Sequence, residues 1–284
     1  IVMESIEHTD QEKREMAHVG TRKEKVLKEL RHLTHVVSYD DADPETFEKV
    51  LGLPSLWCPI FVPWRSVCES ADLPTPGPGV FYGSTYNAER LAYLSYEQLK
   101  DHLIHPELPE IQTPWPKRFD QLQANCLHYL NTNHEPTTGD FDNYVILLRS
   151  FRRELFNLWL EGLRKGYATI NLPSICKFYP GRVVESMAAG RPVITPKPNG
   201  DLMQRLFEPG RDILWYDREL PATLADQIEQ LRQNPTQAEE IVRTARKKIL
   251  KYHTAEIRAR QILDWIESGT QPNYGLTPTT ETLA

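Results

Sequence analysis

The sequence predicts an α/β protein whose C-terminal part is built on a doubly wound parallel sheet. From residue 167 to residue 217, short apolar segments alternate with helix-like segments, which is typical of parallel strands joined by helices. A second strand–helix–strand pattern lies between residues 34 and 64. Its usual structure is a parallel pair of strands with a helical crossover.

The first 72 residues predict a small α/β domain. A strand is expected in THVVSYD (34–40), a helix in PETFEKVLG (44–52) and a strand in SLWCPIFVPW (55–64). The helix has proline at its start and glycine at its end, as helices often do. One such unit is too small to be independent, so we expect a partial domain. The chain begins at Ile1 rather than Met, which suggests that a longer polypeptide has lost its beginning.

A proline- and glycine-rich segment, LPTPGPG (73–79), predicts the linker to a second domain over residues 80–268. That domain begins with VFYGSTYNAER (80–90), which predicts a strand, a glycine turn and a helix. Residues from about 96 to 165 predict a helical insertion that ends in a long helix over 141–166. Residues 269–284 are rich in proline and threonine and predict a flexible tail.

The regular alternation that follows the insertion predicts a Rossmann-like order of elements. These are a strand in YATINLPS (167–174), a helix at 182–189, a strand in PVITP (192–196), a helix in DLMQRLF (201–207) and a strand in DILWYD (212–217). Three helices then close the domain. Thr254 is the expected N-cap of the last helix, and we expect its apolar residues to pack on the protein, namely Ile257, Ile262, Leu263 and Ile266.

Composition excludes several classes of function. The net charge is −6, which does not favour nucleic acid as a partner. No run of about 18 apolar residues occurs, so we expect no transmembrane segment. The four cysteines form no CxxC pair and no histidine cluster has ligand spacing. We therefore expect a cytoplasmic protein without disulfides and without a metal site.

Two loops have the residues of a ligand site, Gly83 to Tyr86 and Pro180 to Val183. Ligands of open α/β sheets bind beyond the carboxyl ends of the strands, where such loops lie. In the second loop, the amides of Gly181, Arg182 and Val183 would point outward from a helix start. Together with the helix dipole and the charge of Arg182, they predict a diphosphate site.

Glu185 lies about one turn into the same helix, which is too far for a simple cap. Its carboxylate suits two neighbouring hydroxyls, such as those of a ribose. Alternatively, Glu185 only favours the helix N-terminus electrostatically. The residues alone leave both interpretations open.

The segment GRVVESMAAGRPVIT (181–195) resembles the donor-site motif in the C-terminal domain of the GT-B glycosyltransferases of the group-1 class, most of all in their spore-maturation-protein-like branch. Three further stretches resemble that branch in the right order. They are VFYGSTYNAER with Gly83, Ser84, Tyr86 and Arg90, then ATINLPS, then GRDILWYD with KYHTAEIRARQIL. Residues 34–64 look like the end of the family's N-terminal domain, and the insertion matches poorly. The resemblance implies a GT-B-like fold.

The resemblance also implies the transfer of a sugar from a nucleotide-diphosphate sugar to an acceptor, with no metal and no other cofactor. Glu185 would hold the nucleotide ribose, and the amides from Gly181 to Val183, with Arg182, would hold the diphosphate. Gly83 and Ser84 would face the diphosphate from across the cleft, and Arg90 would be a second cation. The nucleotide base, the sugar and the acceptor are not implied.

One position departs from the family pattern. Many group-1 enzymes have a first glutamate eight residues before the second, near the donor sugar, and here that position is Lys177. The stereochemical outcome, retaining or inverting, therefore stays open. Lys177, the partial first domain and the helical insertion also suit a non-catalytic GT-B-like interaction protein, with the insertion contacting a protein partner. A nucleotide-sugar epimerase is a lesser alternative, because it would need acid and base residues in a complete first domain.

Overall fold

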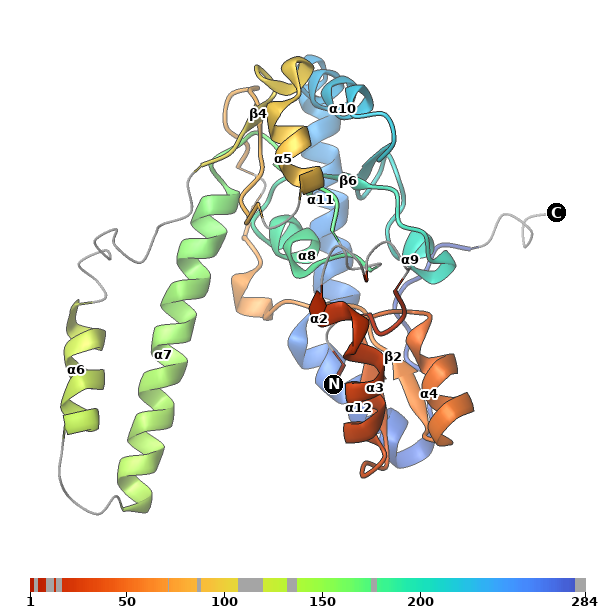
Figure 1. Cartoon of the computed structure of the whole chain (residues 1–284). Helices are drawn as coiled ribbons and strands as arrows, with labels where there is room; N and C mark the ends of the chain where they lie inside the picture. Colours follow the sequence, from red (N-terminus) through yellow and green to blue (C-terminus); the bar gives the residue numbers. More distant parts are fainter. Residues whose placement is uncertain are drawn as a thin grey trace.

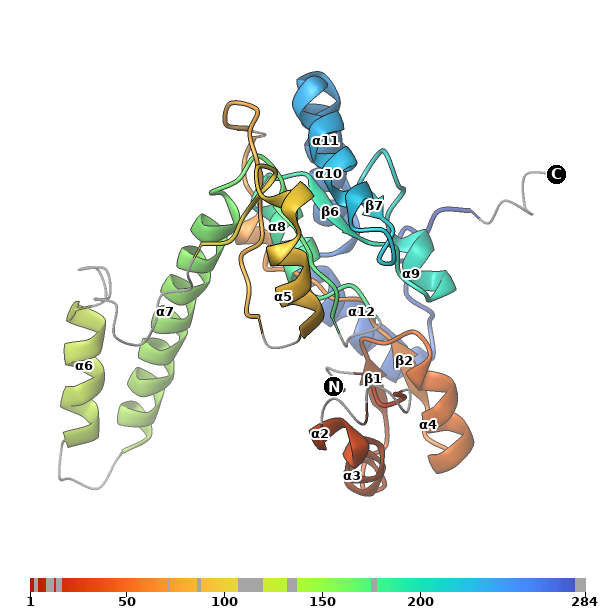
Figure 2. The ribbon, with the colours of Figure 1, turned by 45° about the horizontal axis from the view of Figure 1, so that its top comes forward.

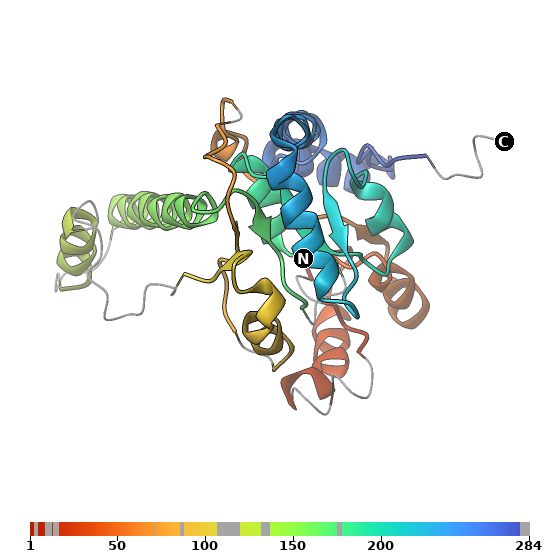
Figure 3. The same ribbon diagram turned by 90° about the horizontal axis from the view of Figure 1, so that it is seen from above.

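The computed structural model describes residues 1–2, 5–8, 13, 17–70, 72–85, 88–106, 120–131, 137–174 and 178–278. In these residues, two parallel sheets of unequal size are each packed against helices, and the smaller part lies below the larger in Figure 1. A pair of helices, α6 and α7, projects to one side of the larger part (Figures 1 and 3). The predicted α/β class with parallel sheets is confirmed.

The smaller sheet consists of β1 (Val36–Ser38) and β2 (Ser55–Trp57), which are parallel and joined by α4 (Asp43–Leu51). Pro44 lies in the first turn of α4, and Gly52 ends it with a left-handed φ of 63°, a conformation that glycine adopts without strain. Figure 2 shows this unit beside α2 and α3. The remaining short elements here are α2 (Ala17–Gly20), α3 (Arg22–Leu30) and η1 (Trp64–Ser66).

The larger sheet has five parallel strands in the order β4-β3-β5-β6-β7. Its strands are β3 (Gly79–Val80), β4 (Leu103–Ile104), β5 (Thr169–Ile170), β6 (Val193–Pro196) and β7 (Leu214–Tyr216). The helices around it are α5 (Ala88–Ser95), η2 (Glu97–Leu99), α6 (Asp120–Asn131), α7 (Thr138–Leu163), α8 (Gly181–Ala188), α9 (Asp201–Leu206), α10 (Ala222–Gln233) and α11 (Pro235–Tyr252).

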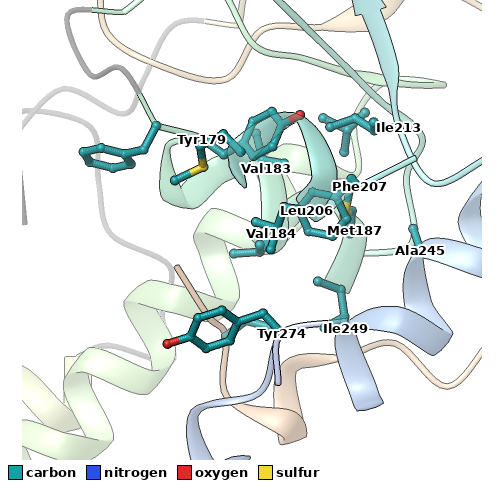
Figure 4. Packing of buried hydrophobic residues seen from close by; sticks show 14 of the residues in the cluster. Tyr179, Val183, Val184, Met187, Leu206, Phe207, Ile213, Ala245, Ile249 and Tyr274 are labelled. Carbon is teal, nitrogen blue, oxygen red and sulfur yellow. The ribbon is translucent and has the colours of Figure 1, made fainter. Parts of the chain in front are cut away.

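Both faces of this sheet are buried, as a doubly wound fold requires. Val193 of β6 points into a core formed with α8 and the second half of α11, and the next residue, Ile194, points into a core on the α10 side. Figure 4 shows the first of these cores, where Val183, Val184 and Met187 of α8 are in the same cluster as Ile249 of α11. The sheet thereby holds α8 in a defined position.

The strand order reverses between β3 and β5. From β3 the chain moves outward to β4, and from β5 it moves in the opposite direction to β6 and β7. In doubly wound sheets, the crevice at the carboxyl ends of two such strands is where ligands bind. The topology therefore points to the loops after β3 and β5.

The last helix, α12 (Ala255–Ser268), connects the larger part back to the smaller sheet. Thr254 accepts a hydrogen bond from the amide of Ile257, which confirms it as the N-cap, and it forms a parallel bridge with Val62. Trp265 packs in one buried cluster with Val37 and Leu56 of the smaller sheet. Thr254 and α12 therefore connect the part with the larger sheet to the part with the smaller sheet.

Arg258 of α12 is completely buried at this junction. Its guanidinium donates to the carbonyl of Tyr252 at 3.2 Å, lies 3.1 Å from Nδ1 of His253, and sits 4.3 Å from the ring centre of Tyr274. Burial lowers the pKa of His253 well below its ordinary value, and the charge of Arg258 acts in the same direction. A neutral His253 can accept the hydrogen bond from Arg258.

The structure corrects two expectations near the C-terminus. Leu263 and Ile266 do not pack on the protein, because they are 56% and 43% exposed and α12 instead buries Arg258 and Trp265. Residues 270–278 also differ from the expected flexible tail. Tyr274 is buried and donates to the carbonyl of Trp57 at 2.5 Å, and the amide of Thr277 donates to Arg205. The remaining residues of the predicted tail, 279–284, lie outside the described residues.

Replacing Arg258 by methionine should destabilise the protein. The carbonyl of Tyr252 and the Nδ1 atom of His253 would each lose a charged donor inside the core, at a cost of about 3 kcal/mol in the free energy of unfolding. Urea denaturation of Arg258→Met measures this cost, with Arg260→Met as the control because Arg260 is exposed on the same helix. Equal denaturation midpoints for the two variants would contradict the prediction.

Candidate active site

The candidate site lies where the loops after β3 and β5 meet the start of α8. Gly83 follows β3, Asn171 follows β5, and Arg182 and Glu185 lie in the first two turns of α8. This is the crevice that the strand order defines. Gly83 and Glu185, which lie far apart in the sequence, are thus brought together at one edge of the sheet.

The guanidinium of Arg182 connects the two loops. Its Nη1 donates to Oδ1 of Asn171 at 3.1 Å, and its Cζ lies 4.9 Å from the ring centre of Phe81. Asn171 is itself held by a hydrogen bond from its Nδ2 to Oγ1 of Thr195. The positive charge of Arg182 is therefore held in one place at the crevice.

Gly83 provides the space that this guanidinium occupies. A Cβ atom at position 83 would lie 2.4 Å from Nη2 and 2.8 Å from Cζ of Arg182, well inside van der Waals contact. The resemblance to the group-1 family implied that Gly83 faces the diphosphate from across the cleft. The structure shows that a protein side chain, Arg182, lies against Gly83.

Helix α8 begins at Gly181, with Pro180 as an extended N-cap residue that provides no side-chain cap. The amide of Val183 donates to the carbonyl of Pro180 at 2.9 Å, and its side chain is fully buried. The expectation that three amides point outward is therefore corrected, because the Val183 amide has an acceptor within the first turn. Gly181 and Arg182 occupy the first positions of the helix, whose amides have no acceptor within an α-helix.

The carboxylate of Glu185 is fixed on one side and lies over the helix start on the other. Nε1 of Trp159, from α7, donates to its Oε2 at 2.8 Å. A Cβ atom built on Gly181 would lie 3.2 Å from its Oε1. The carboxylate therefore reaches back to the first residue of α8, where the sequence predicted the diphosphate.

The pKa of Glu185 is raised above its ordinary value. Burial is the main cause, and it is opposed by the hydrogen bond from Trp159 and the positive charge of Arg182. Burial disfavours the charged form, whereas these two neighbours favour it. Such a perturbed carboxyl at a crevice is typical of functional sites.

Arg90 is buried and holds the two loops together. Its Nε donates to the carbonyl of Pro173 at 2.7 Å, and its Nη1 donates to the carbonyl of Ser84 at 2.9 Å. Its Cζ lies 5.5 Å from the ring centre of Phe81, so this ring lies near both Arg90 and Arg182. Through these contacts Arg90 links the two loops, and its role as a second cation for the diphosphate stays a prediction. The side chain of Ser84 is exposed at the same loop.

Some predicted residues lie outside the described residues, and some described residues were not predicted. Lys177 and Tyr86 belong to the first group. The second group contains Phe81, Asn171 and Trp159. Asn171 had a usable signal, since it is a polar residue directly after a buried strand. The sequence contained no signal for Trp159, because this residue is one of several apolar residues in a long helix. It lies 26 positions before Glu185.

Comparison with known proteins agrees with this geometry. Residues 150–264, which contain α8 and Glu185, match the family model described as "Glycosyl transferase-like". This is less than half of the chain. Comparison with curated proteins by sequence found no match.

Three solved structures illustrate the similarity in fold. Sucrose-phosphate synthase from Thermosynechococcus elongatus has a TM-score of 0.55 at 13% identity, over 90% of this chain and 64% of that one. Anabaena HepE in complex with UDP-glucose has a TM-score of 0.55 at 12% identity, over 89% and 69%. A mutant of S. aureus TarM in complex with fondaparinux, α-GlcNAc-glycerol and UDP has a TM-score of 0.54 at 12% identity, over 87% and 47%.

The fold is therefore that of the GT-B glycosyltransferases. Within it, residues 150–264 are similar to the glycosyl transferase-like family. The chain spans about two thirds of the length of the synthase and of HepE, and about half of TarM. In the part of the chain that the structure describes, we find no helix long and apolar enough to cross a membrane.

Replacing Gly83 by alanine should displace the Arg182 guanidinium without unfolding the protein. Gly83 has no positive φ, so its backbone accepts alanine. The added methyl group would clash with the end of the Arg182 side chain and would lie 3.1 Å from Cζ of Phe81. We expect affinity for nucleoside diphosphates to fall about tenfold, which corresponds to the loss of one charge-assisted hydrogen bond. Calorimetry measures the affinity, and Gly20→Ala, where the new Cβ meets nothing within 4 Å, is the matched control. Unchanged affinity in Gly83→Ala would contradict this role of Gly83.

Proposed function

We propose that this protein binds a nucleotide-diphosphate sugar at the start of α8 and transfers its sugar to an acceptor. The observation that carries the proposal is the placement of the Glu185 carboxylate over Gly181, beside the fixed charge of Arg182. This arrangement lies at the crevice where doubly wound folds bind nucleotides.

Each group has a role that suits its chemistry. The Glu185 carboxylate would accept hydrogen bonds from the ribose hydroxyls. The first amides of α8, with the helix dipole, would bind the diphosphate. Arg182 would stabilise the negative charge that develops on the diphosphate as it leaves, and this electrostatic term requires no metal or other cofactor. Gly83 and Ser84 would line the opposite side of the diphosphate, and Val183 contributes through its packing below the helix start.

The donor sugar would lie next to the segment before α8, where we propose that Lys177 faces it. The acceptor would enter from the side of the smaller sheet. We also propose that the chain belongs to the spore-maturation-protein-like branch, because its Arg-x-x-Glu helix start, Arg182 to Glu185, is the pattern of that branch. A cytoplasmic location would supply nucleotide sugars directly.

Glu185→Gln should weaken the binding of UDP, GDP or ADP, whichever binds the wild type most tightly. The amide keeps an acceptor for Trp159 but loses the negative charge, so the dissociation constant should rise about tenfold or more. Burial raises the pKa of Glu185 in the folded protein above its ordinary value. At a pH above that ordinary value, ionisation of Glu185 therefore lowers the free energy of unfolding of the wild type, and glutamine at this position cannot ionise. The variant should therefore be at least as stable as the wild type at pH 7.

Calorimetry at pH 7 measures this binding, and Glu267→Gln, an exposed glutamate on α12, is the control. No binding of the three diphosphates to the wild type would overturn the proposed donor site. Binding without release or transfer of sugar from UDP-, GDP- or ADP-sugars would favour the non-catalytic alternative.

We further propose that the projecting pair α6 and α7 contacts a second copy of the chain. Leu127, Phe141 and Ile146 are large apolar side chains that are at least half exposed on this pair. Asp142 precedes Ile146 on α7, and exposed arginines follow it at 149, 152 and 153. Two α7 helices that cross antiparallel near Ile146 would therefore pair apolar with apolar residues and acidic with basic ones.

This contact predicts a dimer that Ile146→Glu dissociates. A buried carboxylate at the centre of the interface should raise the dimer dissociation constant at least about tenfold. Sedimentation velocity over a range of concentrations measures the dimer. Val50→Glu, at an exposed apolar residue of α4, should leave it unchanged. A wild type that is monomeric at every concentration would contradict the proposal.

A further inference from the structure

The N-terminal half of helix α7 projects from the larger part of the protein, and its C-terminal end lies at the candidate donor site. The projecting part of the helix packs against α6, whereas its last turns bury Leu160 and Leu163 against Val80 and Ala189. Figures 1 and 3 show α7 running from the larger sheet outward. The same last turns carry Trp159, so this helix contributes a side chain to the site.

The Trp159 ring is held by its surroundings. It packs against the ring of Tyr82 with centres 5.1 Å apart. Tyr82 in turn fits against α7 at Gly162, where a Cβ atom would lie 2.1 Å from its ring. The indole N–H is thereby directed at Oε2 of Glu185, and the ring face lies 5.9 Å from the Arg182 guanidinium.

We propose that Trp159 is a positioning residue for the donor ribose. It holds Oε2 of Glu185 so that Oε1, the oxygen nearer Gly181, stays turned to the helix start where the nucleotide binds. This inference rests on the proposed donor site. It adds that the ligand class is a nucleoside diphosphate with both ribose hydroxyls, and that selectivity for ribose depends on a side chain from the helical insertion.

The physical reason is the freedom of a carboxylate. The terminal torsion of a glutamate is broad, so a carboxylate without a partner on either oxygen rotates easily. One fixed hydrogen bond removes that freedom before the ligand binds, so that the entropic cost of ordering the site on binding is smaller. The ring alone cannot do this, because only the N–H of the indole is a donor.

Trp159→Phe separates positioning from packing. Phenylalanine keeps an aromatic ring between Tyr82 and Arg182 but has no donor for Glu185. The matched control is Trp57→Phe, which also removes one indole hydrogen bond, from Nε1 of Trp57 to the carbonyl of Tyr39 at 3.2 Å. Thermal unfolding of both variants checks that each is folded at the temperature of the binding experiment.

The experiment measures by calorimetry the affinities for the tightest of UDP, GDP and ADP and for its 2′-deoxy counterpart. The wild type should prefer the ribonucleotide by about tenfold, the value of one hydrogen bond to a charged group. In Trp159→Phe that preference should fall to about twofold, with the deoxynucleotide affinity nearly unchanged. Trp57→Phe should keep the wild-type preference.

The possible results are distinguishable. If the wild type binds none of the three diphosphates, the proposed function fails and this inference fails with it. If the wild type prefers the ribonucleotide and Trp159→Phe keeps that preference, only this inference is overturned. If Trp159→Phe weakens both nucleotides equally, Trp159 acts through packing and the inference is likewise overturned.

Discussion

The arrangement of the site depends on the position of one guanidinium, that of Arg182. It lies against the α-carbon of Gly83, donates to Asn171 and covers the ring of Phe81. The loops after β3 and β5 and the start of α8 therefore share one positive charge. An arginine suits this task because its planar group donates in fixed directions while its face packs on an aromatic ring. Arg90 links the same loops by donating hydrogen bonds to the carbonyls of Ser84 and Pro173.

The smaller sheet is oriented relative to this site by contacts from distant parts of the chain. The bridge between Val62 and Thr254 and the buried Arg258 hold the chain end against it. On the other side, the carboxylate of Asp41, which follows β1, lies so close to Gly200, the residue before α9, that a Cβ atom on this glycine would clash with it. The segments that follow β1 and β6 are therefore in contact.

The predicted helical insertion also contributes side chains to the candidate site. Trp159 and Gly162 on α7 make it part of the candidate site through Glu185 and Tyr82. Its outer half instead exposes apolar side chains such as Phe141 and Ile146. One helix therefore has exposed apolar side chains in its outer half and, near its other end, the tryptophan that donates to Glu185.

The sequence by itself determined the Thr254 cap and the order of strands and helices from β5 to α12, because periodicity and capping are local properties of the chain. It did not predict β4 (Leu103–Ile104), which lies in the stretch expected to be a helical insertion. It did not reveal that Trp159 binds Glu185, that Gly83 makes room for Arg182, or that Arg90 holds two loops. Nor did it predict that α12 buries Arg258 while Leu263 and Ile266 face solvent. Only the tertiary structure decided these features, because each depends on which side chains from distant segments share a space, and local patterns carry no information about such distances.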